Sequence, residues 1–221
     1  MTCTAIILAA GMASRMKGTN KQLLSLGGKA VILRSALNFQ NTPEVTEIII
    51  AAKEDDKEEI ERMCLENGIT KLKIVCTGGE TRSKSAEKAF AYAGKTLVTA
   101  IHDGARPFAL PPLISQVVKA AEEYGGAVAA VAVKDTIKVM KDGFVDNTPD
   151  RSTLWSAQTP QAFRTELYRE MLAMGEATDD SQLAERMGIR VKIVEGSYDN
   201  IKMTTPEDIA LGENIVKRTE K

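Results

Sequence analysis

Two cationic side chains near the N-terminus have the types and spacing that bind phosphate. An apolar run at residues 5–8 is followed by small residues and then by a loop that contains Arg15 and Lys21. A guanidinium can hold two phosphate oxygens at once, whereas an ammonium supplies a compact point charge. Such charges stabilise phosphorus during group transfer. The alternative for this loop is a solvated basic surface.

The same loop lacks the signatures of two common nucleotide-binding classes. Met16 stands five residues after Gly11, where a P-loop has its second glycine, and no Gly-Lys-Ser or Gly-Lys-Thr sequence follows within the loop, so the segment is not a P-loop. Gly11 is also the only glycine of the loop before Gly18, so the segment is not a dinucleotide fingerprint. Hydride transfer and P-loop hydrolysis therefore lose support, and phosphoryl or nucleotidyl transfer remains.

A glycine loop at residues 77–85 forms a second candidate site. Its N–H groups and the hydroxyls of Ser83 and Ser85 lie at the start of a predicted helix, where they could bind a base edge or an anion. An N-cap formed by Ser83, with Glu87 nearby, is an equally good interpretation. The loop alone does not decide between binding and capping.

His102 and Asp103 follow a predicted buried strand. Asp103 is a candidate Mg²⁺ ligand, because enzymes of phosphoryl transfer typically hold this ion with one or two carboxylates and phosphate oxygens. His102 is the only histidine of the chain, which excludes multi-histidine metal sites. We interpret it as a hydrogen-bonded structural residue rather than a catalyst. Two later cations, Arg151 and Lys202, are either site residues or surface charges.

Alternating strand and helix patterns place these segments on one edge of a sheet. The predicted strands are residues 5–8, 45–52, 71–75, 96–101, 126–133 and 191–194. Their alternation with helices predicts an α/β fold with a Rossmann-like, doubly wound and mostly parallel sheet. Ligands bind at the carboxyl ends of the strands of such a sheet. Four polar loops follow predicted strands, at residues 9–21, 77–85, 102–107 and 133–136.

Residues 134–160 interrupt this alternation. The turn Lys141-Asp142-Gly143 separates two extended segments and predicts a β-hairpin. Residues 147–163 are expected to be irregular or extended. We interpret the region as an arm that leaves the sheet, while residues 1–221 as a whole fit one domain.

The composition is ordinary for a soluble globular protein, with 43% hydrophobic and 27% charged residues. The net charge of −1 argues against a nucleic-acid or membrane-surface binder, which would be more basic. Three cysteines without a Cys-x-x-Cys pair favour the reducing cytoplasm. The first apolar run is short and no basic residues precede it, so we do not expect it to act as a signal peptide. The longest apolar run, residues 127–133, is too short to span a bilayer.

These motifs together resemble the 2-C-methyl-D-erythritol 4-phosphate cytidylyltransferase family of the non-mevalonate isoprenoid pathway. The N-terminal blocks that carry the resemblance are Ala9-Ala10-Gly11 with Arg15-Met16 and Lys21-Gln22, Gly78-Gly79-Glu80-Thr81-Arg82 with Ser85, and residues 102–107. The C-terminal blocks are residues 134–138, Asp150-Arg151 with Leu154-Trp155, residues 158–161, Thr178-Asp179-Asp180, Glu195-Gly196-Ser197, and Asn200-Ile201-Lys202 with residues 204–208. They occur in order over almost the whole chain. One departure is Ala13, where many relatives have glycine.

The resemblance implies a Mg²⁺-dependent transfer of a cytidylyl group from CTP to a sugar-alcohol phosphate, with release of pyrophosphate. It implies that Arg15 and Lys21 act at the α-phosphate, and that Arg151 and Lys202 hold the acceptor phosphate. The implied substrate contacts are Ala10, Gly11, Gly79, Ser85, Asp103, Thr136 and Thr204, with Asp103 also near the metal. The arm is expected to be exchanged in a homodimer, so that Arg151 completes the neighbour's site.

Three alternatives stay open at this point. A ribitol-5-phosphate cytidylyltransferase shares the fold and the donor, and a sugar-1-phosphate nucleotidyltransferase would use another base. A non-catalytic nucleotide-binding domain would be expected to lose Arg15 or Lys21, and both are present. Asp150-Arg151 with Trp155, together with residues 195–197, is more similar to the methylerythritol enzymes than to the ribitol enzymes.

Overall fold

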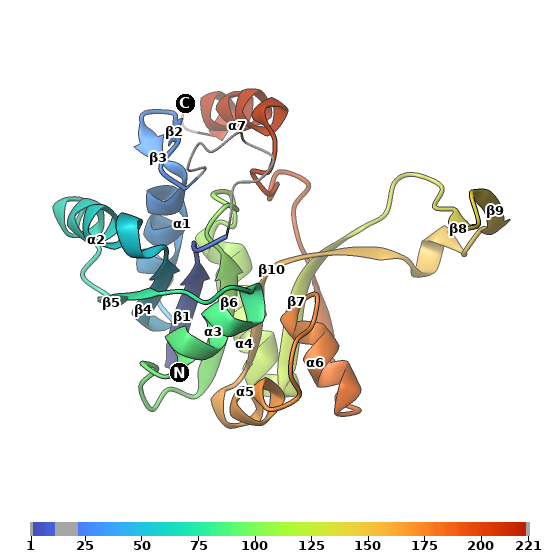
Figure 1. Cartoon of the computed structure of the whole chain (residues 1–221), viewed down its shortest axis with the longest axis horizontal. Coiled ribbons are helices and arrows are strands. Elements are labelled where there is room, and N and C mark those ends of the chain that lie inside the picture. The colour runs from blue at the N-terminus through green and yellow to red at the C-terminus, as the bar shows by residue number, and fades with distance from the viewer. Residues whose placement is uncertain (1, 12–21, 220–221) are drawn as a thin grey trace.

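A mostly parallel sheet forms the centre of the computed structural model, which describes residues 2–11 and 22–219 (Figure 1). Its strands are β1 (Cys3–Leu8), β4 (Val45–Ala52), β5 (Leu72–Thr77), β6 (Val98–Asp103), β7 (Gly126–Ala132), β10 (Trp155–Arg164) and β11 (Lys192–Glu195). Their order is β11-β7-β10-β6-β1-β4-β5, and β10 alone among them is antiparallel to its neighbours. The predicted doubly wound, mostly parallel α/β fold is confirmed.

Helices cover both faces of this sheet (Figure 1). They are α1 (Val31–Gln40), α2 (Lys57–Glu66), α3 (Arg82–Phe90), α4 (Pro111–Tyr124), α5 (Thr165–Leu172), α6 (Asp180–Arg186) and α7 (Pro206–Thr219), with short 3₁₀ turns at Glu54–Asp56 and Arg151–Thr153. One apolar core packs α1, α2 and α4 on the sheet, and a second core packs α3, α5 and α6. Strands that are apolar on both faces need this two-sided cover.

Strand β1 shows how the sequence produces this arrangement. All of its side chains are buried. Ala5 and Ile7 belong to the core that includes α1, whereas Ile6 and Leu8 belong to the core that includes α3, because successive side chains of a strand point to opposite faces. Strand β1 pairs in parallel with β4 and with β6. The loops after β1 and β6 therefore emerge side by side at one edge of the sheet.

A third, smaller core joins α7 to the hairpin of β2 (Ser25–Leu26) and β3 (Lys29–Ala30). The turn Gly27-Gly28 between these strands has positive φ angles of 55° and 76°, which glycine adopts without strain. A Cβ atom at Gly27 would lie 2.5 Å from side-chain atoms of Arg34 and Val216. Helix α7 therefore packs against this turn too closely for a larger residue.

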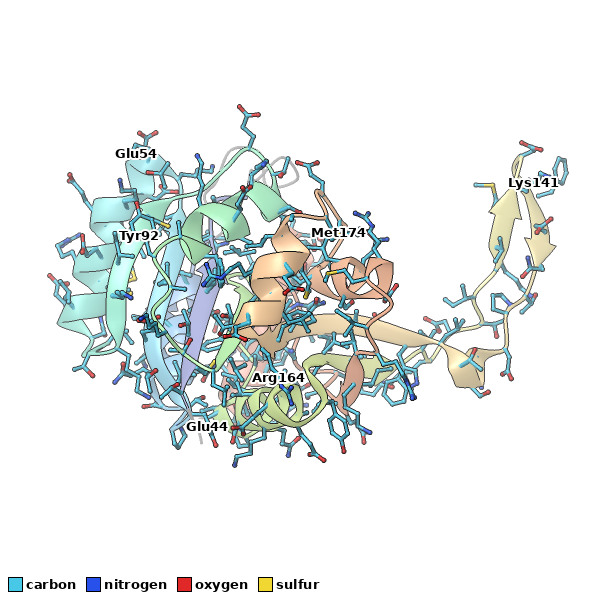
Figure 2. All side chains as sticks on the ribbon, turned by 90° about the horizontal axis from the view of Figure 1, so that it is seen from below. Glu44, Glu54, Tyr92, Lys141, Arg164 and Met174 are labelled. Atoms are coloured by element: carbon cyan, nitrogen blue, oxygen red, sulfur yellow. The ribbon has the colours of Figure 1, made fainter. Side chains whose placement is uncertain are left out.

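The arm begins where β7 ends. Strands β8 (Val139–Lys141) and β9 (Phe144–Asn147) form its hairpin, and Asp142 and Gly143 turn the chain with positive φ, as the predicted turn requires. Figures 1 and 2 show this hairpin standing clear of the rest of the molecule. Trp155 pairs with Ala132 across β10 and β7. The part of the chain that leaves the sheet is therefore residues 133–154.

Strand β10 corrects the prediction of irregular chain at residues 147–163. It extends over Trp155–Arg164 and lies antiparallel between β6 and β7. The polar sequence Gln158-Thr159-Pro160-Gln161 interrupts its apolar pattern, and the pairing with β7 shifts register between Ala157 and Gln161. An interrupted pattern of this kind hides a strand from periodicity. Gln158, Thr159 and Gln161 are themselves buried, and Thr159 hydrogen-bonds to His102 near the site.

The cysteines contribute only to the cores. Cys3, Cys64 and Cys76 are free and buried. Burial raises the pKa of Cys3 to about 12 and that of Cys64 to about 11, so these thiols are poor nucleophiles in the folded chain. Within the described residues, no helix is both long and apolar enough to cross a membrane.

Candidate active site

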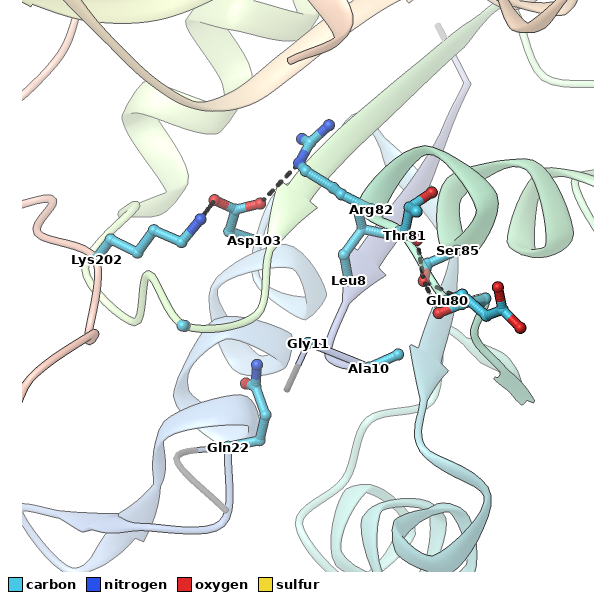
Figure 3. Close-up of a pocket in the computed structure, with 12 residues that line it drawn as sticks. Leu8, Ala10, Gly11, Gln22, Glu80, Thr81, Arg82, Ser85, Asp103 and Lys202 are labelled. Atoms are coloured by element: carbon cyan, nitrogen blue, oxygen red, sulfur yellow. Dashed lines mark hydrogen bonds and ion pairs between the residues drawn. The ribbon is translucent and has the colours of Figure 1, made fainter. Parts of the chain in front are cut away.

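A pocket of about 320 Å³ lies at the carboxyl edge of the sheet (Figure 3). The loop after β1, the loop before α3 and the end of β6 meet there. Its wall includes six of the predicted site residues: Ala10, Gly11, Gly79, Ser85, Asp103 and Lys202. The sheet order changes direction at this point, because β4 follows on one side of β1 and β6 lies on the other. Ligands of doubly wound sheets bind in this position.

The loop before α3 is shaped by two glycines. A Cβ atom at Gly78 would lie 2.3 Å from the Cβ of Ala10, and one at Gly79 would lie 2.5 Å from the Cβ of Lys84. Ser85 closes the loop, because its hydroxyl accepts a hydrogen bond from the N–H of Gly79 at 3.0 Å and donates to a loop carbonyl at 2.9 Å. The loop backbone is thereby held against Ala10 at the pocket wall.

Thr81 caps α3, and the interpretation of Ser83 as its N-cap is wrong. The hydroxyl of Thr81 accepts from the N–H of Lys84 at 3.2 Å, and Thr81 has the extended backbone of an N-cap. The hydroxyl of Ser83 accepts instead from the N–H of Ala177 at 3.4 Å. Helix α3 starts at Arg82, so Ser83 lies inside its first turn and turns toward the segment before α6.

Asp103 ends β6, and three cations surround its carboxylate. Arg82 Nε lies 3.2 Å from Oδ1, while Lys202 Nζ lies 2.7 Å and Arg106 Nε 3.9 Å from Oδ2. Arg82 and Lys202 approach from opposite sides (Figure 3). Burial alone would raise the pKa of Asp103, but the charges of Arg82, Lys202 and Arg106 outweigh it and hold that pKa well below its ordinary value. Asp103 is therefore ionised at neutral pH, with three cationic side chains beside it.

Contacts on both sides of Lys202 fix its backbone. The buried amide of Asn200 donates to the carbonyl of Thr159 in β10 at 2.9 Å. The N–H of Met203 donates to the carbonyl of Ala105, in the loop after β6, at 2.8 Å. The chain between these two anchors directs the Lys202 ammonium into the pocket (Figure 3). The side chain itself remains 39% exposed, so it can reach a ligand.

The donors around the pocket suit Mg²⁺. Asp103 supplies one buried carboxylate, and the described residues contain no group of three or more His, Cys, Asp or Glu side chains that could hold a metal ion by themselves. Mg²⁺ usually keeps several waters and binds through one or two carboxylates together with substrate phosphates. Asp103 with the phosphates of a bound ligand would provide such a site.

Three predicted site residues are not among the described residues that line the pocket. Arg151 and Thr136 are exposed on the arm, where Arg151 donates to the carbonyl of Lys134 at 2.9 Å. Thr204 donates through its N–H and its hydroxyl to the carboxylate of Asp208, at 2.7 and 2.9 Å, and so closes the first turn of α7. The predicted roles of these three residues stay predictions.

The catalytic residues predicted from the first loop, Arg15 and Lys21, lie outside the described residues, and so does Ala13. The residues on either side of this segment, Gly11 and Gln22, both line the pocket.

Sequence reasoning gave no role to Arg82, although it lines the pocket and contacts Asp103. The same guanidinium contacts Asp180 at the start of α6. One signal in the sequence pointed to such a pairing: Asp103 follows a predicted buried strand, and a buried carboxylate needs a cation as partner. Sequence spacing did not show which cation, since Arg82 and Asp180 are 98 positions apart.

His102 is a structural residue, as predicted. It is fully buried, and its Nε2 lies 3.0 Å from the carbonyl of Arg106, so Nε2 carries the proton. The hydroxyl of Thr159 accepts from the N–H of Asp103 and donates to His102 Nδ1, each at 3.0 Å. Both ring nitrogens are therefore occupied in the neutral form. The ring fixes the end of β6 and with it the backbone of Asp103.

We expect the metal-free protein to lose stability as the pH falls from about 6.5 to about 4. Burial, which outweighs the charge of Asp103 beside it, lowers the pKa of His102 to about 4. Between these pH values the unfolded chain binds more protons than the folded chain. The free energy of unfolding therefore decreases as the pH decreases, by about 3 kcal/mol in total. Denaturant unfolding at several pH values measures the slope. The variant His102→Gln should give a flatter profile, and a wild-type profile equally flat would contradict this assignment.

The fold and the pocket together define an α/β protein with a polar pocket at the switch point of a doubly wound sheet, where nucleotide-binding proteins of this kind hold their ligands. Residues 3–218 match the family model described as "2-C-methyl-D-erythritol 4-phosphate cytidylyltransferase" (IspD). The chain is 43% identical to the protein of that name from Geobacillus kaustophilus, over 98% of this chain and 97% of that protein. It is also 43% identical to the one from Caldanaerobacter subterraneus, over 99% of this chain and 100% of that protein.

Solved structures agree with these relatives. The crystal structure of 4-diphosphocytidyl-2C-methyl-D-erythritol synthase from Anaerococcus prevotii matches with a TM-score of 0.88 at 32% identity, over 98% of this chain and 96% of that chain. The chain therefore belongs to the 2-C-methyl-D-erythritol 4-phosphate cytidylyltransferase family, and the predicted resemblance is confirmed. Members of this family are nucleotidyltransferases.

Proposed function

We propose that this chain transfers the cytidylyl group of CTP to 2-C-methyl-D-erythritol 4-phosphate, giving 4-diphosphocytidyl-2-C-methyl-D-erythritol and pyrophosphate for isoprenoid precursor synthesis. Family membership over nearly the whole chain supports this reaction. The observation that carries it in the structure is the pocket in which Asp103 lies between Arg82 and Lys202 beside the glycine loop. This arrangement combines a wall for a nucleotide with a fixed carboxylate and an ammonium for phosphate.

The reaction exchanges one phosphorus–oxygen bond for another. An oxygen of the acceptor phosphate attacks the α-phosphorus of CTP in line, and the bond from that phosphorus to the oxygen shared with the β-phosphate breaks. The bonding electron pair leaves with pyrophosphate. Because the attacking oxygen is already anionic, no general base is required, which fits a chain whose one histidine is fully hydrogen-bonded in the core. Catalysis then depends on positioning and charge stabilisation.

The pocket residues divide between the two substrates. We assign cytidine and the triphosphate to the wall formed by Ala10, Gly11, Gly79 and Ser85. Asp103 is assigned to the ribose and to Mg²⁺, and Lys202 to the acceptor phosphate. Bound Mg²⁺ would neutralise negative charge on the triphosphate as pyrophosphate departs. Both assignments require the Lys202–Asp103 contact, at 2.7 Å in the free chain, to open when substrates bind.

The functional unit in this proposal is a homodimer formed through the arm. The arm hairpin exposes four large apolar side chains, Val139 (40%), Met140 (68%), Phe144 (79%) and Val145 (64%). The hairpin itself lies far from the body of the chain (Figure 2). An exposed apolar patch of this kind favours a protein interface. Arg151 and Thr136 lie on the same arm. Exchange of arms between two copies would cover the apolar side chains and bring both polar residues to the partner's pocket.

A cytoplasmic location is part of the same proposal. The cysteines are free, and free cysteines are typical of proteins in the reducing cytoplasm. Both assigned substrates are anionic and water-soluble, which places the reaction in an aqueous compartment.

An assay of pyrophosphate release tests the reaction. The purified chain is incubated with Mg²⁺, CTP and one acceptor at a time, and we expect turnover with methylerythritol phosphate and its loss when EDTA removes the metal. ATP and UTP in place of CTP test the choice of base. Turnover with ribitol 5-phosphate but not with methylerythritol phosphate would select the ribitol enzyme. CTP binding without product from any acceptor would select a non-catalytic nucleotide-binding domain.

A further inference from the structure

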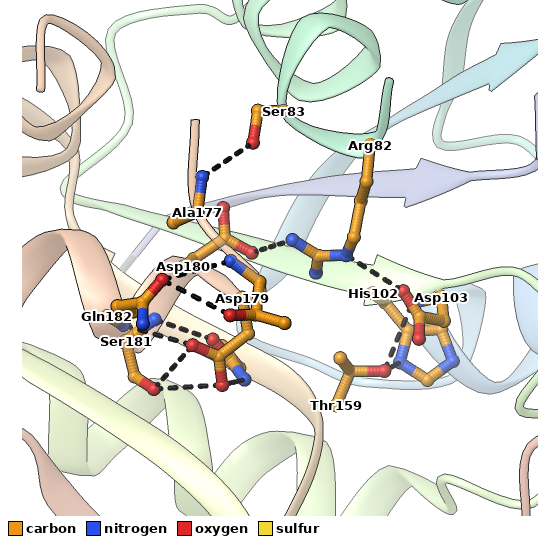
Figure 4. A network of polar contacts seen from close by, with 12 residues as sticks. Arg82, Ser83, His102, Asp103, Thr159, Ala177, Asp179, Asp180, Ser181 and Gln182 are labelled. Carbon is orange, nitrogen blue, oxygen red and sulfur yellow. Dashed lines mark hydrogen bonds and ion pairs between the residues drawn. The ribbon is translucent and has the colours of Figure 1, made fainter. Parts of the chain in front are cut away.

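Arg82 joins two carboxylates that come from distant parts of the chain (Figure 4). It is the first residue of α3, and its Nε lies 3.2 Å from Asp103 Oδ1. Its Nη1 lies 2.6 Å from Asp180 Oδ2, at the start of α6. A planar guanidinium can bridge two carboxylates in this way, whereas a lysine ammonium is a single point charge. Asp103 faces the pocket, and Asp180 is not among the described residues that line it.

Asp180 is anchored in the core. Its side chain is 3% exposed, and its second oxygen, Oδ1, accepts a hydrogen bond from the hydroxyl of Tyr168 at 2.9 Å. Tyr168 is fully buried between Phe90 and Phe163, with ring centroids 5.3 and 5.9 Å away. Both oxygens of Asp180 are therefore occupied, and the aromatic packing fixes the hydroxyl that holds one of them. A chain of direct contacts runs from this aromatic cluster through Asp180 and Arg82 to the pocket.

The two charged partners of Asp103 on either side of the pocket differ in freedom. Lys202 contacts Oδ2 through a flexible side chain that is 39% exposed. Arg82 contacts Oδ1 through a side chain that is 24% exposed and anchored at its other end by Asp180. In the proposed reaction Lys202 leaves Asp103 for the acceptor phosphate. Arg82 is the partner whose anchor keeps it in place when that happens.

The pairing of Arg82 is also incomplete. Its Nη2 atom is buried and has no hydrogen-bond partner within the described residues. A buried donor without a partner costs stability. An arginine that served only to join α6 to the sheet would be more stable with this nitrogen paired. In the observed arrangement Nε contacts Asp103 while Nη2 has no partner among the described residues. This favours the view that Arg82 holds Asp103 in the pocket over the view that it only joins α6 to the sheet.

We infer that Arg82 is a positioning residue for the proposed reaction: it fixes the Asp103 carboxylate toward the pocket, and Asp180 and Tyr168 fix Arg82 in turn. The inference rests on the proposed function for what Asp103 does, namely to meet Mg²⁺–CTP. Partners that orient a metal-binding carboxylate typically change metal affinity by about 10- to 100-fold when they are removed. Arg82 acts through Asp103 and needs no contact of its own with either substrate.

Measurements of nucleotide binding in the absence of acceptor, where no reaction can occur, test this inference. The affinity of the full chain for Mn²⁺–CTP is measured by calorimetry without acceptor, and the affinity for CTP is measured separately in EDTA. The variant Asp180→Asn is expected to weaken Mn²⁺–CTP binding about tenfold or more and to weaken the binding of metal-free CTP by a clearly smaller factor, because without metal only the assigned ribose contact of Asp103 is affected. Because loss of one partner of a buried ion pair can unfold a protein, Tyr168→Phe is the milder second variant. It keeps the ring and should shift the same ratio in the same direction by a smaller factor.

The adjacent variant Asp179→Asn is the matched control. Asp179 caps α6 by accepting from the N–H of Gln182 at 3.0 Å. The hydrogen bonds of Arg82 to carboxylates of the described residues go to Asp103 and Asp180 and not to Asp179. This control should leave the metal-dependent ratio unchanged. Equal ratios in wild type, Asp180→Asn and Tyr168→Phe would overturn the inference, as would an equal loss in Asp179→Asn. A wild-type chain that binds Mn²⁺–CTP but forms no product with any acceptor would overturn the proposed function, while the ratios still decide the positioning role.

Discussion

Replacing Lys21 with alanine is expected to lower kcat by about 10²- to 10³-fold, the usual effect of removing one preorganised donor from developing charge. Negative charge grows on the α-phosphate and on the leaving pyrophosphate. The described cations that line the pocket, Arg82 and Lys202, both contact Asp103. In the proposed reaction Arg82 stays with Asp103 and Lys202 moves to the acceptor phosphate, so we assign to Arg15 and Lys21 the side-chain charge that meets the leaving group beside Mg²⁺.

Steady-state kinetics with CTP and the acceptor measure this effect. The loss should fall mainly on kcat rather than on the KM for CTP, because the interaction strengthens only as the transition state forms. Lys29→Ala is a matched control, since Lys29 is exposed on β3 and is not one of the described residues that line the pocket. Near-normal kcat in both Lys21→Ala and Arg15→Ala would show that another group stabilises the transferred phosphate.

The position of the site could be predicted because it depends on topology. Parallel strands end at one edge, so polar loops that follow such strands must meet there. Ala10, Gly79 and Asp103 belong to three different loops or strand ends and line one pocket. Lys202 joins them because Met203 hydrogen-bonds to the loop after β6. For Lys202, residue type alone left a surface charge equally possible, and the family resemblance supplied the expectation.

The contacts between side chains within the site could not be predicted in the same way. Arg82 meets Asp103 and Asp180 across 21 and 98 positions of sequence, and no periodicity links residues at such separations. Strand β10 was missed for a related reason, because its polar residues interrupt the apolar pattern from which a strand is predicted. One of these polar residues, Thr159, bonds to both His102 and Asp103. Side chains that serve the site thus disturbed the local pattern from which the strand would have been predicted.

Replacing Arg151 with alanine is expected to lower kcat/KM for the acceptor by about 10- to 10²-fold, the range for losing a hydrogen bond to a charged group. The KM for CTP should change little, because Arg151 is assigned to the acceptor phosphate. Arg151 lies exposed on the arm, away from the described wall of its own chain's pocket. A loss confined to CTP binding would contradict the assignment. The same variant can also show which chain's pocket Arg151 serves.

Mixed dimers of Lys21→Ala and Arg151→Ala make this test. If the arms are exchanged, one of the two sites in each mixed dimer receives an intact Lys21 from one chain and an intact Arg151 from the other. Random pairing into closed dimers makes half of the dimers mixed, so co-refolding should restore about a quarter of the wild-type rate. If Arg151 serves its own chain, every site keeps one defect and no activity returns. Recovery therefore requires that two chains build one site, because neither variant alone carries both cations.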